Sequence, residues 1–184
     1  MYWLNCSLCS ALTPAPSGKT LSVVTTKEQI LGYLEEVHDP EVPVLSVVDL
    51  GSIRNVELDT EGTVITITPT YTDCPAMNVI EDDIRAKMKE KGISNVNIKT
   101  VLSPAWTTDW ISEEGKKKLQ EYGIAPPEKT SQDKSLLSNK PKVVKCPRCG
   151  STDTEMKSFF GSTACKALYV CHNCKEPFDY FKCI

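Results

Sequence analysis

The chain has 184 residues, of which 40% are apolar, and 24 acidic against 21 basic side chains give it a formal net charge of −3. This length fits one domain of ordinary size plus a small module, and the apolar fraction is sufficient for a core. The sequence has no run of about 18 apolar residues, the length that crosses a membrane, so we expect no membrane partner. Residues 1–18 lack the positively charged start of a signal peptide, which favours the cytoplasm.

Nine cysteines are many for this length, and they are unevenly distributed. Most of them lie between Cys146 and Cys183, which favours metal binding over a disulfide framework. Cys6 and Cys9 form a lone Cys-x-x-Cys pair, a weak metal signal, in a stretch without periodicity. The predicted order is a flexible arm, a domain, a linker and a C-terminal module, over residues 1–26, 27–127, 128–145 and 146–184.

The domain is predicted to begin with a helix and a β-hairpin. Thr26 is a suitable N-cap for a helix that has to end before Pro40, with an apolar stripe formed by Ile30, Leu31, Leu34 and Val37. Residues 53–58 and 63–68 are predicted to be the hairpin strands, joined by a turn at 59–62. Asp49, beside Gly51, either forms a turn or orients the loop that follows the hairpin.

Cys74 lies in that loop, where a strand is expected to become a helix. After it, apolar residues recur at helical spacing until Gly92: Met77, Ile80, Ile84 and Met88. Pro75 fits the first helical turn. Cys74 is then expected at or near the N-cap, where N–H groups and the helix dipole favour a thiolate. Such a thiolate serves as a nucleophile, a redox sensor or a metal ligand; the alternative is a buried cysteine that acts as a small apolar residue.

A third strand and a last helix complete the predicted domain. Residues 96–102 alternate in polarity, and Ser112 is a suitable cap for a helix that contains Leu119 and Tyr122. Trp106 and Trp110 between them are interpreted as a lid on the core. The result is an α+β class, a small sheet with packed helices in the order α-β-β-α-β-α. We expect residues 27–127 to fold without the C-terminal module.

The predicted domain is acidic. Residues 27–127 contain 10 basic and 18 acidic side chains, so this stretch carries 10 − 18 = −8. A surface of that sign repels phosphate backbones. We therefore expect no nucleic-acid partner.

The C-terminal module carries two Cys-x-x-Cys pairs, 21 residues apart: Cys146, Cys149, Cys171 and Cys174. This spacing predicts one tetrahedral site of four cysteines in a small all-β zinc ribbon. A module of this size does not hold together by burial alone, so metal binding would supply its folding energy. Cys165 and Cys183 are surplus thiols beside the site. They could hold a second metal, hold a transient iron–sulfur cluster, or remain reduced without a role.

Several motifs carry a resemblance to known families. Residues 39–43, 48–51, 72–75, 103–106 and 123–127 resemble the small iron–sulfur assembly domain family that includes SufT-like maturation factors. Residues 160–169 and 176–183 resemble the D proteins of the phenylacetyl-CoA epoxidase system. The resemblance implies a reactive or cluster-transfer thiol at Cys74 and zinc knuckles at the four paired cysteines. The candidate supporting residues are Asp49, Thr72, Cys165 and Cys183.

The resemblance implies an accessory factor in aerobic phenylacetate degradation, one that assists iron or iron–sulfur insertion into the reductase or oxygenase component and works with iron–sulfur assembly machinery. The residues agree, because the chain shows no carboxylate and histidine set for a di-iron oxygenase and is not expected to be the enzyme. Two alternatives stay open: a structural subunit or adaptor of the epoxidase, and a zinc-ribbon nucleic-acid binder, which the charge disfavours.

Overall fold

The structure is a computed structural model, and it describes residues 25–60, 62–127 and 143–182. Most of the predicted arm and linker, together with Cys6, Cys9 and Cys183, therefore lie outside the described residues. Within the described residues, no helix has both the length and the apolar character needed to cross a membrane. The elements in chain order are α1 (Lys27–Leu34), β1 (Ile53–Leu58), β2 (Thr63–Ile67), α2 (Ala76–Glu90), β3 (Val96–Thr100), the 3-10 helix η1 (Thr108–Trp110), α3 (Glu113–Tyr122), β4 (Ile124–Ala125), β5 (Thr154–Ser158), β6 (Lys166–Cys171) and β7 (Pro177–Phe181).

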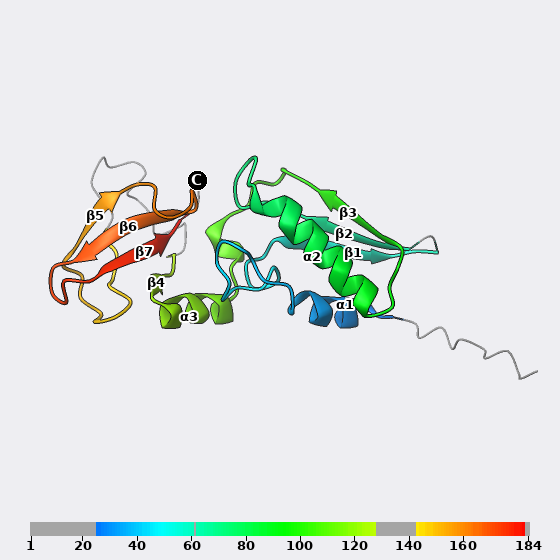
Figure 1. Cartoon of the computed structure of the whole chain (residues 1–184), viewed down its shortest axis with the longest axis horizontal. Helices are drawn as coiled ribbons and strands as arrows, with labels where there is room; N and C mark the ends of the chain where they lie inside the picture. Colours follow the sequence, from blue (N-terminus) through cyan, green and yellow to red (C-terminus); the bar gives the residue numbers. More distant parts are fainter. Residues whose placement is uncertain (1–24, 61, 128–142, 183–184) are drawn as a thin grey trace, which may run out of the picture.

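The predicted α+β class and the element order of the first domain are confirmed. A three-stranded sheet has the order β1-β2-β3, with β1 antiparallel and β3 parallel to β2. Because successive β2 side chains point to opposite faces, Ile65 and Ile67 turn inward together. They pack against α1 and α2, and Figure 1 shows α2 crossing the sheet. This core carries the loop of Cys74 at one end of β2.

The helix ends follow the sequence signals. Thr26 accepts a hydrogen bond from the Gln29 N–H, and the Gln29 side chain accepts one from the Thr26 N–H, which is a capping box. Ser112 caps α3 by accepting from the Gly115 N–H. The α1 helix ends at Leu34, earlier than Pro40 requires, yet Val37 is still buried in the core.

The second sheet has the order β4-β7-β6-β5, and it joins the two predicted parts of the chain. Its ribbon strands β5, β6 and β7 are antiparallel, as expected for an all-β module. Strand β4 directly follows α3, and it pairs in parallel with β7. The sequence did not predict β4, because two residues are too few to show a period.

A hydrophobic cluster also spans both parts. Cys165 and Phe181 of the C-terminal module are buried with residues of the first domain: Val42, Leu45, Leu50, Trp106, Ile111, Leu119 and Ile124. The Phe181 ring meets the Trp106 ring edge to face, with centroids 6.1 Å apart. The lid interpretation of Trp106 agrees with its burial and with its indole N–H donating to the Leu50 carbonyl. This shared packing argues against independent folding of residues 27–127.

Candidate functional site

Four cysteine sulfurs converge in the C-terminal module. Cys146 and Cys149 precede β5, Cys171 ends β6, and Cys174 lies in the turn before β7. The four sulfurs all lie within 4.8 Å of one another. Cys146 and Cys174 are separated by 3.8 Å, and Cys149 and Cys171 by 3.5 Å. The structure therefore brings together all four residues that the spacing predicted.

This arrangement fits a tetrahedral metal ion. With a zinc–sulfur bond of about 2.3 Å, the edges of a tetrahedron of sulfurs measure about 3.8 Å, close to the two separations above. Four thiolates fill every position, so the ion would be structural and would carry no reaction. The residues present fit zinc as the sequence expected, and the ion would tie the start of β5 to the end of β6.

The protonation of the four thiols is uneven. The Ser151 backbone N–H and the Asn173 amide lower the pKa of Cys149 to about 6. For Cys174, the Glu176 backbone lowers the pKa, but partial burial and the neighbouring cysteines outweigh this effect and raise the pKa to about 12. Cys149 is thus available as a thiolate at a lower pH than Cys174. A cation bound to it would draw the remaining protons off its neighbours.

Cys74 is held by a tight turn before α2. Asp73 adopts a left-handed backbone with φ of 60°, which Asp tolerates better than most residues. The N-cap of α2 is Pro75, so Cys74 precedes the cap by one residue, near the place that the sequence predicted. Its side chain is only 8% exposed and belongs to the main core.

The expectation that Cys74 is a thiolate is wrong for this conformation. Burial raises the pKa of the Cys74 thiol, and hydrogen bonds from Tyr71 and the Ala76 backbone do not compensate. The negative charges of Glu41 and Asp39 raise this pKa further. The helix dipole is outweighed because the side chain is buried beside carboxylates. Cys74 is therefore a protonated, shielded thiol.

Glu41 and Tyr71 connect this thiol to the other part of the chain. The Tyr71 hydroxyl contacts the Cys74 sulfur, and it donates to Glu41 Oε1 at 3.4 Å. Asp39 accepts from the N–H groups of Glu41 and Val42 at 2.7 and 2.8 Å, which fixes the turn that carries Glu41. The sequence analysis identified neither Glu41 nor Tyr71 as a site residue.

Cys165 lies in a different place from the one expected. The sequence placed it beside the four-cysteine site, whereas the structure buries it in the cluster shared with the first domain. Its sulfur is 3.5 Å from Glu41 Oε2 and 3.0 Å from Thr163 Oγ1. Burial raises its pKa to about 11. Position along β6 explains the difference, since Cys165 and Cys171 lie at opposite ends of that strand.

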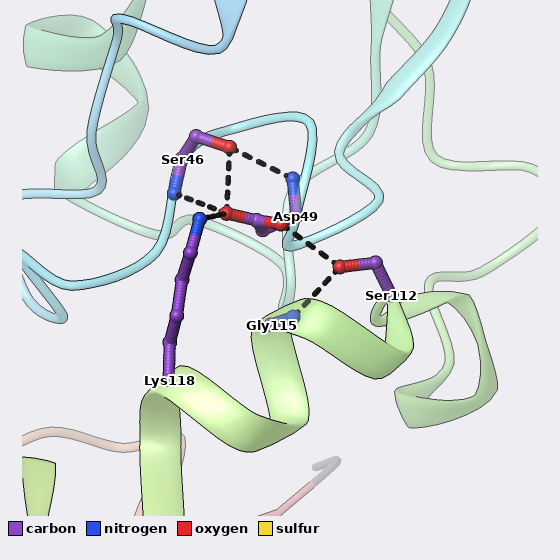
Figure 2. Close-up of polar contacts among 5 residues, drawn as sticks. All are labelled: Ser46, Asp49, Ser112, Gly115 and Lys118. Atoms are coloured by element: carbon purple, nitrogen blue, oxygen red, sulfur yellow. Dashed lines mark hydrogen bonds and ion pairs between the residues drawn. The ribbon is translucent and has the colours of Figure 1, made fainter. Parts of the chain in front are cut away.

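Asp49 is a structural residue rather than part of the thiol loop. Its carboxylate accepts hydrogen bonds from Ser46 Oγ at 3.0 Å, Ser112 Oγ at 2.9 Å and Lys118 Nζ at 2.6 Å (Figure 2). Burial raises the pKa of Asp49, but these donors outweigh burial and lower it. Asp49 thus locks α3 onto the preceding loop. Thr72, the other expected supporting residue, is exposed beside Cys74.

Two protein families match successive parts of the chain. Residues 27–100 match the family described as "Iron-sulfur cluster assembly protein", and residues 130–182 match the "PaaD zinc beta ribbon domain". The first match contains Glu41, Tyr71 and Cys74, and the second contains Cys165 and the four paired cysteines. The polar cluster around Glu41 is therefore built from both families' regions.

Curated relatives agree with both matches. The chain is 49% identical over 156 residues, covering 85% of this chain and 92% of the relative, to an Escherichia coli (strain K12) protein provisionally named as the D component of 1,2-phenylacetyl-CoA epoxidase. It is 43% identical over 91 residues, 48% of this chain and 86% of the relative, to an "Fe-S protein maturation auxiliary factor" of Porphyromonas gingivalis (strain ATCC BAA-308 / W83). A Bacillus subtilis (strain 168) factor of the same description is 36% identical over 49% of this chain and 89% of its own length. The chain therefore belongs to the PaaD family, in which an iron–sulfur cluster assembly domain precedes a zinc β-ribbon.

Proposed function

We propose that this protein is an accessory factor for maturation of the 1,2-phenylacetyl-CoA epoxidase, and that it supplies iron or an iron–sulfur cluster to a reductase or oxygenase component. In this proposal it receives its cargo from iron–sulfur assembly machinery and does not oxygenate the substrate. The names of the relatives support both halves of the proposal: one names the epoxidase, and the others name maturation of iron–sulfur proteins.

The observation that carries the proposal is the state of Cys74. A buried, protonated thiol is protected from oxidation, and it becomes a ligand only when a cation displaces its proton. In this proposal Cys74 binds a metal transiently, because the proton competes with the metal for the sulfur. The four paired cysteines have a different role in the proposal, since a closed zinc site would stabilise the second sheet without taking part in transfer.

Co-expression of the epoxidase components with this protein or with Cys74→Ser tests the proposal. Serine is nearly the same size as cysteine but lacks the soft sulfur ligand, so the variant should fold. We expect epoxidase activity and the iron content of the purified components to fall with the variant, while the variant stays folded with a modestly lower melting temperature, because a hydroxyl replaces a buried sulfur. Full activity and full iron content with a folded Cys74→Ser variant would contradict a transfer role.

An adaptor role is the second candidate, favoured by an exposed aromatic pair. Phe159 and Phe160 are 53% and 58% exposed, and they follow β5 directly. Exposed aromatic side chains are common anchors in protein interfaces. The adaptor role predicts that Phe160→Ala lowers epoxidase activity by the same factor as it lowers binding to the reductase or oxygenase component. It also predicts that Cys74→Ser has no effect on epoxidase activity.

A further inference from the structure

Two cysteines that the four-cysteine cluster does not use lie on either side of Glu41, where the two parts of the chain join. Cys74 comes from the loop before α2, and Cys165 directly precedes β6. Cys165 donates to Glu41 Oε2, while Cys74 reaches the other oxygen of the same carboxylate through the Tyr71 hydroxyl. The fold thus brings two thiols from distant parts of the sequence to one carboxylate.

The spacing of the Cys165 sulfur and the Glu41 oxygen already suits a shared ion. The two atoms are 3.5 Å apart. A tetrahedral ion with a metal–sulfur bond of about 2.3 Å and a metal–oxygen bond of about 2.0 Å holds its sulfur and oxygen ligands about 3.5 Å apart. Lys166 Nζ donates to the Glu41 carbonyl at 2.9 Å, so the backbone of Glu41 is tied to the residue after Cys165.

We propose that Glu41, Cys74 and Cys165 form a second metal site, separate from the four-cysteine cluster, for a thiophilic divalent cation of the Fe(II) class. The inference rests on the proposed function, because it names the residues that hold iron before transfer. Two thiolates and one carboxylate suit divalent iron, cobalt or zinc. Three protein ligands leave one tetrahedral position open, through which the ion can pass to a recipient.

One side chain has to move before Cys74 reaches the ion. The Tyr71 hydroxyl lies between Cys74 and Glu41 and contacts both. A hollow of about 90 Å³ beside the ring is lined by Tyr71, Leu102 and Trp106, among others, and the proposal has the ring turn toward it. When the ring turns into this space, the sulfur and the carboxylate face each other without the hydroxyl between them.

Binding at this site is a ligand exchange without a change of oxidation state. The S–H bonds of Cys74 and Cys165 break, two metal–sulfur bonds form, and two protons pass to water. Glu41 and the two thiolates then carry −3, and the divalent cation offsets two of these charges. Lys166, whose Nζ donates to the Glu41 carbonyl, lies near the remaining charge and near Asp39. Each sulfur is bonded to the cation, so the buried sulfurs are not left as unpaired anions.

Cobalt titration of the zinc-loaded full-length protein under anaerobic conditions tests the site, with Co(II) as the probe. Zinc fills the four-cysteine cluster first, and zinc in the dialysate is measured to show that cobalt does not replace it. We expect one further Co(II) per chain, with sulfur-to-cobalt charge-transfer absorption in the near ultraviolet. Cys165→Ser should reduce this absorption, and Glu41→Gln should weaken cobalt binding at least about tenfold.

The matched control for Glu41→Gln is Glu57→Gln, which removes an exposed carboxylate on β1 and should leave cobalt binding unchanged. Thermal unfolding of each variant shows whether it is folded. Because Glu41 is only half-buried, we expect Glu41→Gln to fold, and it tests the site even if Cys165→Ser is unstable. Wild-type affinity and absorption in folded Glu41→Gln, or in folded Cys165→Ser, would overturn the inference. So would the absence of a further bound Co(II) in the wild type.

The epoxidase assay separates this inference from the proposed function. If Cys74→Ser blocks maturation while folded Cys165→Ser binds cobalt and supports maturation like the wild type, the function stands and the second metal site is wrong. If Cys165→Ser loses cobalt while Cys74→Ser matures the epoxidase fully, the site exists and the proposed function is wrong.

Discussion

At the scale of single residues, Asp49 shows how a polar network can hold two elements together. It joins the loop before β1 to α3 through Ser112 and Lys118, and the Ser112 N–H also donates to the Asp49 carbonyl at 2.9 Å. The Lys118 side chain is 39% exposed, whereas that of Asp49 is 12% exposed. Partial burial makes this ion pair stronger than a surface pair, although water still screens it.

Lys118→Met should destabilise the protein by about 1 kcal/mol, because Asp49 loses a charged donor while Met keeps the apolar stem. Lys117→Met is the matched control, since Lys117 is 67% exposed and its pair with Glu121 is 4.0 Å long. Urea unfolding of both variants at pH 7 measures the difference. Equal stabilities would show that the Asp49–Lys118 pair contributes nothing.

The same pair predicts a pH dependence. The folded-state pKa of Asp49 lies below its ordinary value, so the stabilisation is present above the unfolded pKa of about 3.9. It is lost as the pH falls through the lower, folded pKa. The stability gap between wild type and Lys118→Met should therefore be constant near neutrality and shrink below about pH 4. A gap that persists unchanged at pH 2 would contradict the role of the carboxylate.

The backbone conformation at the end of the loop before β1 requires glycine at position 51. Its φ is +71°, and a Cβ there would overlap the carbonyl oxygen of Trp110. Gly51→Ala should cost about 3 kcal/mol, from the left-handed backbone and the steric clash together. Gly92→Ala has the same kind of backbone, with φ of +82° and open space around a Cβ, and should cost about 1 kcal/mol. Thermal melts compare the two, and equal losses would rule out the clash.

At the scale of elements, local signals predicted most of the first domain. The caps at Thr26 and Ser112 and the stripe of Ile80, Ile84 and Met88 are each visible in a few neighbouring residues. The Cys-x-x-Cys pairs likewise predicted the four-cysteine cluster. The protonation of Cys74 was not predictable in this way. It depends in part on the charge of Glu41, which is distant from Cys74 in the sequence.

Metal removal should unfold the ribbon strands. Cys149→Ser should lower the zinc content well below one ion per chain and reduce the β-sheet signal, because the ion supplies folding energy to β5 and β6. Glu57→Gln is the control, since Glu57 is exposed on β1, outside both proposed metal sites, and its variant should retain zinc. Atomic emission and circular dichroism measure the two effects. Full zinc content in Cys149→Ser would contradict the assignment of this ligand.

At the scale of the whole molecule, the two parts share a hydrophobic cluster and a sheet, and we expect them to unfold together. Phe181 is 1% exposed, and it packs in the cluster with Trp106. Phe181→Ala should cost about 3 to 5 kcal/mol and destabilise the first domain together with the ribbon. Phe160→Ala, at an exposed ring, should change stability by less than about 0.5 kcal/mol. If Phe181→Ala lowers only the melting of the ribbon, the parts fold separately.

Contacts between the two parts are what the sequence did not reveal. The β4–β7 pairing, and the position of Cys165 against Glu41, join residues more than fifty positions apart, and neither leaves a period or a motif in the sequence. The C-terminal module was therefore interpreted as a tethered zinc ribbon. In the structure it also completes the polar cluster around Cys74.

Iron transfer between purified proteins tests the central proposal most directly. The wild-type protein or Cys74→Ser is loaded with Fe(II) anaerobically and mixed with tagged, iron-free oxygenase or reductase component, which is then separated and analysed for iron. We expect faster loading from the wild type than from free Fe(II), no such gain with Cys74→Ser, and zinc retained by the donor in both cases. Equal loading by wild type, Cys74→Ser and free Fe(II) would contradict a transfer role for Cys74.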